Sequence, residues 1–182
     1  SHGMIMTMNR NSCIHIKLEI NKISWIVLIA WVGMFITIGC VNSDEKIASP
    51  ISGETFFHGN FNLDIHRGKP VLINFWFPSC PPCRAEMPDL QIAYEKYGED
   101  IAFIGIQQMG ADSEKAGIEF IRELGLTYPI MADFGSKVQS NYEIFSFPTT
   151  VFLKKDHSIA RVWTGIIDEQ QLNQQLDAIL GS

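Results

Sequence analysis

The sequence predicts an α/β domain with a mixed sheet flanked by helices, an added N-terminal β-hairpin and one N-terminal transmembrane helix. Two observations predict the domain. Apolar runs of strand length alternate with segments of helix length over 51–182, and the last two strand segments are close enough to pair as an antiparallel hairpin. A third observation, an uncharged apolar stretch over 23–41, predicts the membrane helix.

Bulk composition narrows the functional classes. The chain has 182 residues, 46% of them hydrophobic and 19% charged, as expected for one globular domain with an appendage. Its formal net charge is −6, from 14 Lys and Arg against 20 Asp and Glu, which argues against nucleic-acid binding because that calls for a basic face. Four cysteines are too few for a disulfide scaffold, and two of them, Cys80 and Cys83, stand in a C-x-x-C spacing.

The N-terminal segment predicts attachment to a membrane. Residues 1–4 are interpreted as a tag-cleavage remnant and 5–22 as a cytoplasmic tail. The stretch 23–41 carries no charge, and as a helix it would span about 28 Å, close to the hydrocarbon thickness of a bilayer. Lys and Arg outnumber acidic residues before this stretch, so everything after Val41 is expected outside the cytoplasm.

Three processing outcomes stay open for this stretch. The helix is retained as an anchor, it is cleaved as a signal peptide, or Cys40 is lipidated, because 37–40 resembles a bacterial lipobox with Thr37 where leucine is usual. A buried core helix is a fourth interpretation, but core helices are seldom apolar on every face for this length. Polar residues 42–50 are expected to link the stretch to the domain over 51–182.

The first half of the domain is predicted to contain a hairpin, two buried strands and a long helix. Residues 54–68 are expected to form a short hairpin region. The run 71–76 is almost continuously apolar, which is typical of a central strand covered on both faces. A helix is expected over 80–97, ended by Gly98, and 101–107 predicts a second buried strand.

The second half is predicted to close the sheet with an antiparallel hairpin. A helix is expected over 112–124, opened by Asp112 or Ser113 and stopped by Gly125. The remaining elements are expected to be a short strand at 129–132, a brief helix at 136–142, hairpin strands at 149–153 and 158–163, and an amphipathic helix at 168–180 with Ile167, Leu172, Leu176 and Ile179 facing inward.

The chemistry is expected at Cys80-Pro81-Pro82-Cys83, where a buried strand passes through a loop into a helix. A cysteine at a helix start lies near unpaired backbone N–H groups and the positive end of the helix dipole, which stabilise a thiolate. The thiolate is the nucleophile of disulfide exchange. Proline suits the first helical turn, because its missing N–H costs nothing there.

Two other uses of a C-x-x-C pair are weighed against this one. Zinc needs a second pair of ligands, and the other cysteines, Cys13 and Cys40, lie on or before the membrane stretch, so no metal site is predicted. A purely structural disulfide is the second alternative, but closing so small a loop stabilises a fold little.

The stretch 74–88 resembles the active site of the thioredoxin-like TlpA/ResA/CcmG family of membrane-anchored thiol–disulfide oxidoreductases. The resemblance covers about residues 53–180 and implies a thioredoxin-like fold. A second hallmark lies at 147–153, which resembles the cis-proline loop that packs against the cysteine pair in that family. The residues that the resemblance implies for binding a substrate protein are Phe147, Pro148, Trp76, Ser79, Pro81 and Pro82.

Glu86 is the third catalytic candidate. Thioredoxins keep a buried Asp in the strand before the motif, and here that position is Asn74. In the ResA-like branch, a Glu three residues after the second cysteine lies near the pair, and Glu86 occupies that position. A half-buried carboxyl has a raised pKa and can exchange protons with Cys83. The alternative is an exposed helix Glu without a catalytic role.

The chain also departs from the family pattern at three places. Ser79 stands directly before the first cysteine where Trp is usual, Phe77-Pro78 replaces an Ala-containing turn, and Ser146 replaces a frequent Gly. These changes alter the surface that a partner would touch and leave the cysteine chemistry intact.

The resemblance implies a mechanism, partners and a location. Cys80 attacks a partner disulfide, Cys83 resolves the mixed disulfide, and Glu86 assists proton transfer. The redox-active disulfide Cys80–Cys83 serves in place of any metal or organic cofactor. Electrons are expected from a membrane thiol reductant of the DsbD/CcdA type, and they pass to disulfide-containing extracytoplasmic proteins, with apocytochrome c in cytochrome c maturation as an example. The expected location is the bacterial cell membrane, with a single-pass or lipid anchor.

Two rival functions remain as alternatives. A peroxiredoxin-like peroxidase would place threonine three residues before its reactive cysteine, where this chain has Phe77. A thioredoxin-fold copper carrier usually spaces its cysteines by three residues and adds a histidine. The motif alone does not choose between reductant and oxidant, because C-x-x-C potentials range from about −270 to −120 mV on one fold.

Overall fold

A computed structural model describes residues 45–182 of the chain. The predicted cytoplasmic tail, the predicted membrane stretch 23–41 and the lipidation candidate Cys40 lie outside the described residues. Over 45–182, no helix is both long and apolar enough to cross a membrane.

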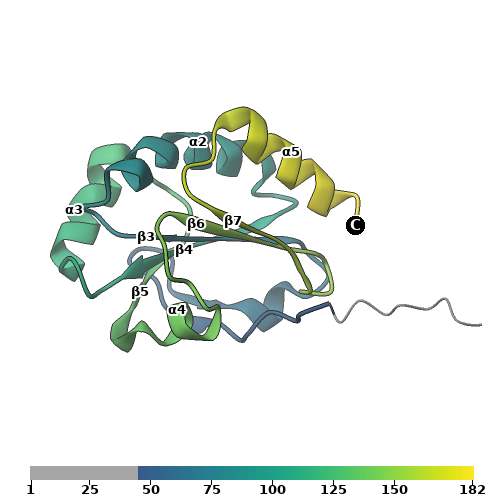
Figure 1. Ribbon diagram of the computed structural model, residues 1–182, viewed down its shortest axis with the longest axis horizontal. Helices are drawn as coiled ribbons and strands as arrows, with labels where there is room; N and C mark the ends of the chain where they lie inside the picture. Colours follow the sequence, from purple (N-terminus) through teal and green to yellow (C-terminus); the bar gives the residue numbers. More distant parts are fainter. Residues whose placement is uncertain (1–44) are drawn as a thin grey trace, which may run out of the picture. The chain divides into compact units, whose positions relative to one another are not determined.

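A five-stranded mixed sheet forms the centre of the domain (Figure 1). The central strand β3 (Val71–Trp76) pairs in parallel with β4 (Ala102–Gln108) and antiparallel with β6 (Thr149–Leu153). The edge strands are β5 (Ile130–Asp133), parallel to β4, and β7 (Ile159–Thr164), antiparallel to β6. The resulting order is β5-β4-β3-β6-β7.

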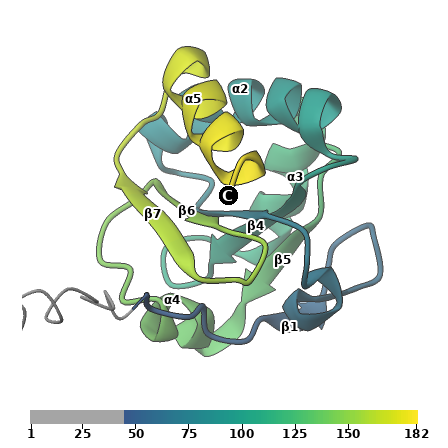
Figure 2. The same cartoon turned by 90° about the vertical axis from the view of Figure 1, so that its right-hand side faces the viewer.

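Three helices cover one face of this sheet, as both ribbon views show (Figures 1 and 2). They are α2 (Pro81–Tyr97), α3 (Glu114–Leu124) and α5 (Glu169–Leu180). Side chains cap two of these helices as expected of Ser and Asp: Ser113 accepts the N–H of Ala116, and Asp168 forms a capping box with Gln171. The helix bounds agree with the predicted ones to within two residues.

The opposite face of the sheet carries the first elements of the domain and a short helix. A two-stranded hairpin joins β1 (Ser52–Glu54) to β2 (Asn60–Asn62), and the 3-10 helix η1 (Leu63–His66) follows it. The 3-10 helix η2 (Phe134–Ser136) leads into α4 (Lys137–Asn141). Figure 2 shows α4 and β1 on the side of the sheet away from α2 and α5.

The continuous apolar run of β3 is explained by two cores. Leu72 and Trp76 point into the core under α2, α3 and α5, while Val71, Ile73 and Phe75 point into the core on the other face. Both sets are fully buried. Successive side chains of a strand face opposite sides, so a strand whose two faces are both covered is apolar at nearly every position. Asn74 is the one polar residue of this strand.

The predicted N-terminal hairpin is confirmed, but its predicted bounds, 54–68, are wrong. The paired strands begin earlier, at Ser52, and η1 occupies Leu63–His66 within the predicted region. The Asn62 side chain accepts the N–H of Asp64 at 3.0 Å and turns the chain there, so pairing ends at Asn62. Residues 46–48, expected in the linker, already hydrogen-bond to residues 157–159.

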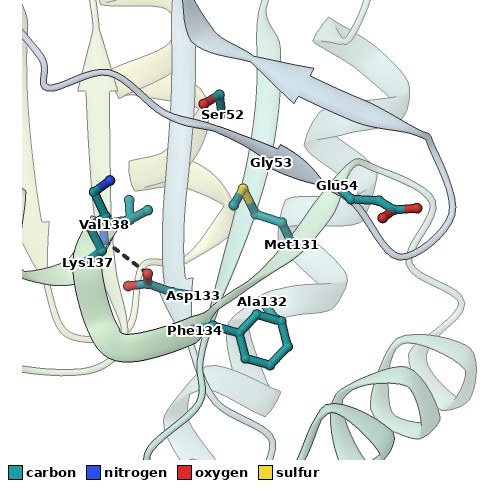
Figure 3. Close-up of a pocket in the computed structure, with 9 residues that line it drawn as sticks. All are labelled: Ser52, Gly53, Glu54, Met131, Ala132, Asp133, Phe134, Lys137 and Val138. Atoms are coloured by element: carbon teal, nitrogen blue, oxygen red, sulfur yellow. Dashed lines mark hydrogen bonds between the residues drawn. The ribbon is translucent and has the colours of Figure 1, made fainter.

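A pocket of about 310 Å³ lies beside β1 and α4 (Figure 3). Residues of β1, β5, η2 and α4 line it. Asp133, one of the lining residues, is buried, and its carboxylate accepts the N–H groups of Val138 at 3.0 Å and Gln139 at 2.8 Å. No residue of the cysteine motif lines this pocket.

Candidate active site

The cysteine pair lies where β3 ends and α2 begins. After Trp76, a turn closes through the N–H of Cys80, which donates to the carbonyl of Phe77 at 3.1 Å. Cys80 is the N-cap of α2, and its Sγ accepts the N–H of Cys83 at 3.2 Å. Pro81 and Pro82 occupy the first two helical positions, where no N–H is needed for the helix.

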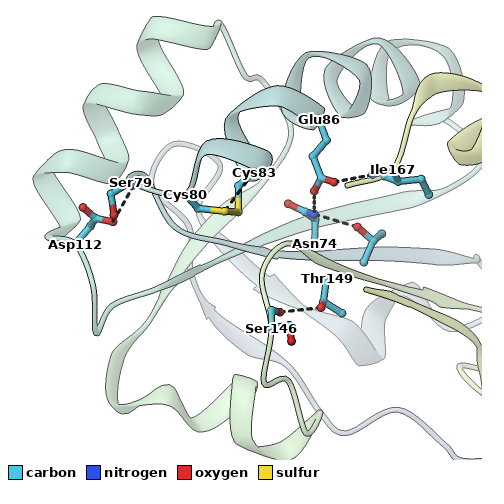
Figure 4. Close-up of a disulfide and its surroundings, with 10 residues drawn as sticks. Asn74, Ser79, Cys80, Cys83, Glu86, Asp112, Ser146, Thr149 and Ile167 are labelled. Carbon is cyan, nitrogen blue, oxygen red and sulfur yellow. Dashed lines mark hydrogen bonds between the residues drawn. A yellow bond between two sulfur atoms is a disulfide. The ribbon is translucent and has the colours of Figure 1, made fainter. Parts of the chain in front are cut away.

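Cys80 and Cys83 are joined by a disulfide (Figure 4), with their Cα atoms 5.3 Å apart. Cys80 is 3% exposed and Cys83 is fully buried. The two prolines between them are exposed. Of the two sulfurs, that of Cys80 is therefore the nearer to a partner molecule.

Glu86 is buried one turn along α2, with 1% of its surface exposed. The Nδ2 group of Asn74 donates to its Oε1 at 2.8 Å, and the N–H of Ile167 donates to its Oε2 at 3.1 Å (Figure 4). Burial raises the pKa of Glu86 to about 7, because desolvation outweighs the two hydrogen bonds that favour the charged form. The exposed-helix alternative for Glu86 is therefore wrong.

Asn74 takes part in a buried polar cluster that spans three elements. Its Nδ2 also donates to Oγ1 of Thr150 at 3.0 Å, so β3, β6 and α2 meet at this amide. Sequence reasoning missed Thr150 and Ile167. Thr150 pairs directly with Asn74 across β3 and β6, a neighbour that the register alone would identify.

The loop before β6 packs beside the cysteine motif. The Phe147–Pro148 peptide is cis, as the resemblance implied. The Phe147 ring packs edge-on against Phe77 with centroids 5.3 Å apart, and both rings pack against the core cluster that contains Cys80 and Cys83. Pro148 is buried, and its carbonyl accepts the N–H of Gly165 at 2.8 Å.

The residues predicted to bind a partner fall into two groups. Ser79, Pro81 and Pro82 are exposed and Phe147 is half-buried. Trp76 differs: its side chain is fully buried and stacks on Phe120 with ring centroids 4.9 Å apart. The expectation that Trp76 touches a partner is corrected, because the last residue of a strand covered on both faces has no route to the surface.

Asp112 is a neighbour of the site that sequence reasoning did not include. It follows β4, and its Oδ2 accepts both the N–H of Ser79 at 2.9 Å and the hydroxyl of Ser79 at 2.8 Å (Figure 4). The strand order could have indicated this contact, because β3 and β4 are parallel neighbours and the loops after their carboxyl ends meet at one edge of the sheet. Within the described residues, no group of three or more His, Cys, Asp or Glu is arranged to hold a metal ion.

Comparison with known proteins identifies the family. Residues 48–162 match the model of the AhpC/TSA family. The chain belongs to that family. It is 33% identical over 117 residues to the thioredoxin-like protein YneN of Bacillus subtilis, covering 64% of this chain and 68% of that one. It is 32% identical over 120 residues to the thiol–disulfide oxidoreductase ResA of Geobacillus thermodenitrificans, covering 64% and 67%.

A solved structure gives the same fold. The crystal structure of a thiol:disulfide interchange protein of the thioredoxin family from Chlorobium tepidum superposes with a TM-score of 0.71 at 21% identity, covering 77% of this chain and 99% of that one. The domain over 45–182 therefore has the thioredoxin-like fold, and the chain is a thiol–disulfide oxidoreductase of the ResA type.

Proposed function

We propose that this oxidoreductase reduces disulfides in proteins outside the cytoplasm, with Cys80 and Cys83 as its dithiol. The observation that carries the proposal is the position of Cys80 at the N-cap of α2, where its sulfur accepts the N–H of Cys83. After reduction of the pair, the same N–H and the helix dipole stabilise a thiolate on Cys80.

The reaction proceeds in two exchanges. The Cys80 thiolate attacks one sulfur of a partner disulfide, forms a mixed disulfide and releases the partner's other sulfur as a thiolate. The Cys83 thiolate then attacks the Cys80 sulfur, re-forms the Cys80–Cys83 bond and releases the second partner sulfur. The partner gains two electrons and two protons overall, and the cysteine pair becomes oxidised.

Glu86 supplies the proton acceptor for the second exchange. Cys83 is fully buried, so its thiol has little access to water and needs a nearby base. Glu86 lies three residues further along α2, on the same face of the helix. A pKa of about 7 leaves a large share of Glu86 ionised at neutral pH and ready to accept this proton.

The docking surface is formed by Ser79, Pro81 and Pro82 on one side of the sulfurs and by Phe147 on the other, with the buried Pro148 shaping the loop that carries Phe147. The three residues beside the cysteines are exposed, and the half-buried Phe147 ring offers an apolar contact. The Pro148 carbonyl accepts the N–H of Gly165, and Thr149 is paired within the sheet, so an extended backbone of a partner next to its cysteine would pair with the chain before Pro148.

A wider setting belongs to this proposal, supported by the N-terminal sequence and by the family resemblance. The domain is held at the bacterial cell membrane by the stretch 23–41 or by a lipid on Cys40. A membrane thiol reductant of the DsbD/CcdA type re-reduces the pair. Partners are disulfide-containing extracytoplasmic proteins, with apocytochrome c as one candidate, and no metal or organic cofactor takes part.

Trapping the mixed disulfide tests the proposal. Cys83→Ser in the reduced full chain is expected to accumulate a covalent adduct with a test protein that carries one exposed disulfide, seen on a non-reducing gel and mapped by mass to Cys80. Cys80→Ser is the matched control and is expected to give no adduct. An adduct of Cys80→Ser through Cys83 would contradict the assignment of the nucleophile.

The direction of electron flow has its own measurement. The equilibrium of the full chain with glutathione is expected to give a potential nearer to about −270 mV than to about −120 mV, the two ends of the C-x-x-C range. A value at the oxidising end would contradict a reducing function and leave the cysteine roles intact.

A further inference from the structure

A carboxylate from a neighbouring loop holds the residue directly before Cys80. One oxygen of Asp112 accepts both the backbone N–H and the hydroxyl of Ser79, at 2.9 and 2.8 Å. The turn that Ser79 belongs to is closed by the Cys80 N–H on Phe77. Asp112 therefore fixes this turn from outside, at the last residue before the sulfur (Figure 4).

Within residues 45–182, the Asp112 carboxylate makes no other side-chain hydrogen bond or ion pair that would explain its position. Ser113, not Asp112, caps α3, because the Ser113 hydroxyl accepts the N–H of Ala116 at 3.2 Å. The loop around Asp112 is itself held on both sides. Gln108 accepts the N–H of Ala111 at 3.2 Å, and Gln107 donates to the carbonyl of Ser113 at 3.1 Å. The carboxylate is thus presented to Ser79 by a braced loop.

We propose that Asp112 is a positioning residue for Cys80: it fixes the turn that presents the sulfur and places a negative charge that opposes the Cys80 thiolate. The inference deepens the proposed function and rests on Cys80 as the nucleophile. A helix N-terminus stabilises a thiolate, and a carboxylate beside the same terminus works against it. Asp112 thereby sets the balance of these two effects.

The other charged groups around this end of α2 do not replace Asp112. On the α3 side, Arg84, Glu119 and Glu123 line a pocket of about 260 Å³ together with Asp112 and Ser79. Arg84 is occupied by Glu123 at 2.8 Å, so these two charges compensate.

The remaining elements add little charge near Cys80. Glu119 is exposed, and its nearest cation is Lys115 at 3.8 Å. Glu86 lies deeper along α2, bonded to Asn74 and Ile167. The loop before β6 brings Ser146, Phe147 and Pro148, which carry no charge.

The charge has a consequence that depends on pH. Removing it lowers the pKa of Cys80, and we expect a fall of about half a unit for a partly screened carboxylate. A stabilised thiolate favours the reduced pair, in the exchange that converts two glutathione thiols and the Cys80–Cys83 disulfide into glutathione disulfide and two protein thiols. When the Asp112 charge is removed, the equilibrium constant for forming the reduced pair rises about threefold at pH values above the Cys80 pKa, where the thiolate exists. At pH values below that pKa, it hardly changes.

The test compares three variants of the full chain with the wild type. Asp112→Asn keeps an oxygen that can accept both Ser79 hydrogen bonds and removes the charge. Glu119→Gln removes a charge from the same pocket without touching Ser79. Ser79→Ala removes one hydrogen bond and keeps the charge. The readout is the midpoint of the pH profile for iodoacetamide alkylation, mapped by mass to Cys80, rather than the plateau rate, because intrinsic reactivity falls with the pKa.

Asp112→Asn is expected to lower the midpoint by about half a unit, and the other two variants by less than half of that shift. The glutathione equilibrium constant is expected to change only on the alkaline side of the midpoint. A fourth variant, Asp112→Ala, removes the charge and also releases the turn, and it is expected to reduce a protein disulfide about threefold more slowly than Asp112→Asn at every pH, close to the loss of one net hydrogen bond.

The outcomes separate this inference from the proposed function. A profile of Asp112→Asn that superimposes on the wild type, or an equal shift in Glu119→Gln, overturns the role of Asp112 alone. A change in the glutathione constant that is the same at all pH values also overturns the charge effect, since a neutral structural change would give it. Wild-type labelling that maps first to Cys83 overturns the proposed function itself.

Discussion

Asn74 donates a 2.8 Å hydrogen bond to Glu86, and both side chains are buried. Asn74 cannot titrate, so the acid at this end of the sheet belongs to α2 instead of β3. The second oxygen of Glu86 is held by the N–H of Ile167. A carboxyl fixed at both oxygens and shielded from water is a group whose protonation affects stability and catalysis together.

The first prediction concerns stability against pH. The pKa of Glu86 is about 7 in the folded protein against an ordinary value of 4.5, so between these values the folded state binds a proton that the unfolded chain releases. The contribution of this group to the free energy of unfolding is fully present below about pH 4.5 and is lost as the pH rises through about 7, by up to about 3 kcal/mol.

Glu86→Gln removes this dependence. Urea unfolding at pH 4.5, 6 and 8 is expected to show a wild-type minus variant difference that falls across the window. Glu99→Gln, an exposed carboxyl near the end of the same helix, is the control and should give a constant difference. A constant difference for Glu86→Gln as well would mean that Glu86 titrates in the folded state as it does in water.

The second prediction concerns the exchange steps. Ionised Glu86 opposes the ionisation of the nearby thiols, so Glu86→Gln should lower the apparent pKa of the cysteine pair, read as a macroscopic value for coupled groups. The same change removes the proton acceptor for Cys83. Resolution of the mixed disulfide near neutral pH should therefore slow by about tenfold or more. Stopped-flow reduction of a test disulfide across pH measures both effects, and superimposed profiles would move the proton path elsewhere.

The sequence predicted the central elements because their patterns are strong and local. The run Val71–Trp76 is apolar at every position except Asn74, and this pattern has few solutions other than a strand between two cores. The start of α2 followed from Cys80 and two prolines, whose geometry suits a helix N-terminus. Cys83 and Glu86 lie three residues apart in α2 and are both buried, a neighbourhood that helical spacing alone predicts.

The parts that were missed depend on contacts between distant segments. The bonds of Asp112 to Ser79 join the loops after β4 and β3, and they become visible only when the sheet order is known. The family resemblance implied that Trp76 contacts a partner, yet its place in the strand buries it against Phe120. The end of the hairpin was misplaced because the Asn62 side chain accepts the N–H of Asp64 and ends the strand pairing there. Sequence patterns do not reveal this single hydrogen bond.

The third prediction tests the corrected position of Trp76. Trp76→Ala is expected to lower the free energy of unfolding by about 3 to 5 kcal/mol, because it leaves a cavity beside Phe120. Phe147→Ala is the comparison variant, since its ring is half-buried and adjoins the docking surface. It should cost less stability and raise the KM for a protein substrate instead. Chemical denaturation and steady-state reduction give the two readouts, and a mild loss in Trp76→Ala would contradict its core position.

The fourth prediction concerns topology. Lys and Arg exceed acidic residues before Ile23, so the domain after Val41 should lie outside the cytoplasm. Fusions joined at about Pro50 are expected to be active with a reporter that works only outside the cytoplasm and inactive with one that works only inside. Exchanging Arg10, Lys17 and Lys22 for Gln should weaken this preference. Activity of the cytoplasmic reporter in the unaltered chain would contradict the assigned orientation.

The last prediction concerns which sulfur reacts. In the reduced full chain, Cys80 is expected to be alkylated at least about tenfold faster than Cys83 at mildly acidic to neutral pH. Two causes act in the same direction: the N-cap position stabilises the Cys80 thiolate, and Cys83 is shielded within the core with Glu86 opposing its ionisation. Brief exposure to iodoacetamide followed by mass mapping measures both rates. Cys80→Ser is the control, because slow labelling of Cys83 in that variant shows that burial, rather than competition for reagent, protects it. Equal rates in the wild type would mean that the helix start does not select the nucleophile.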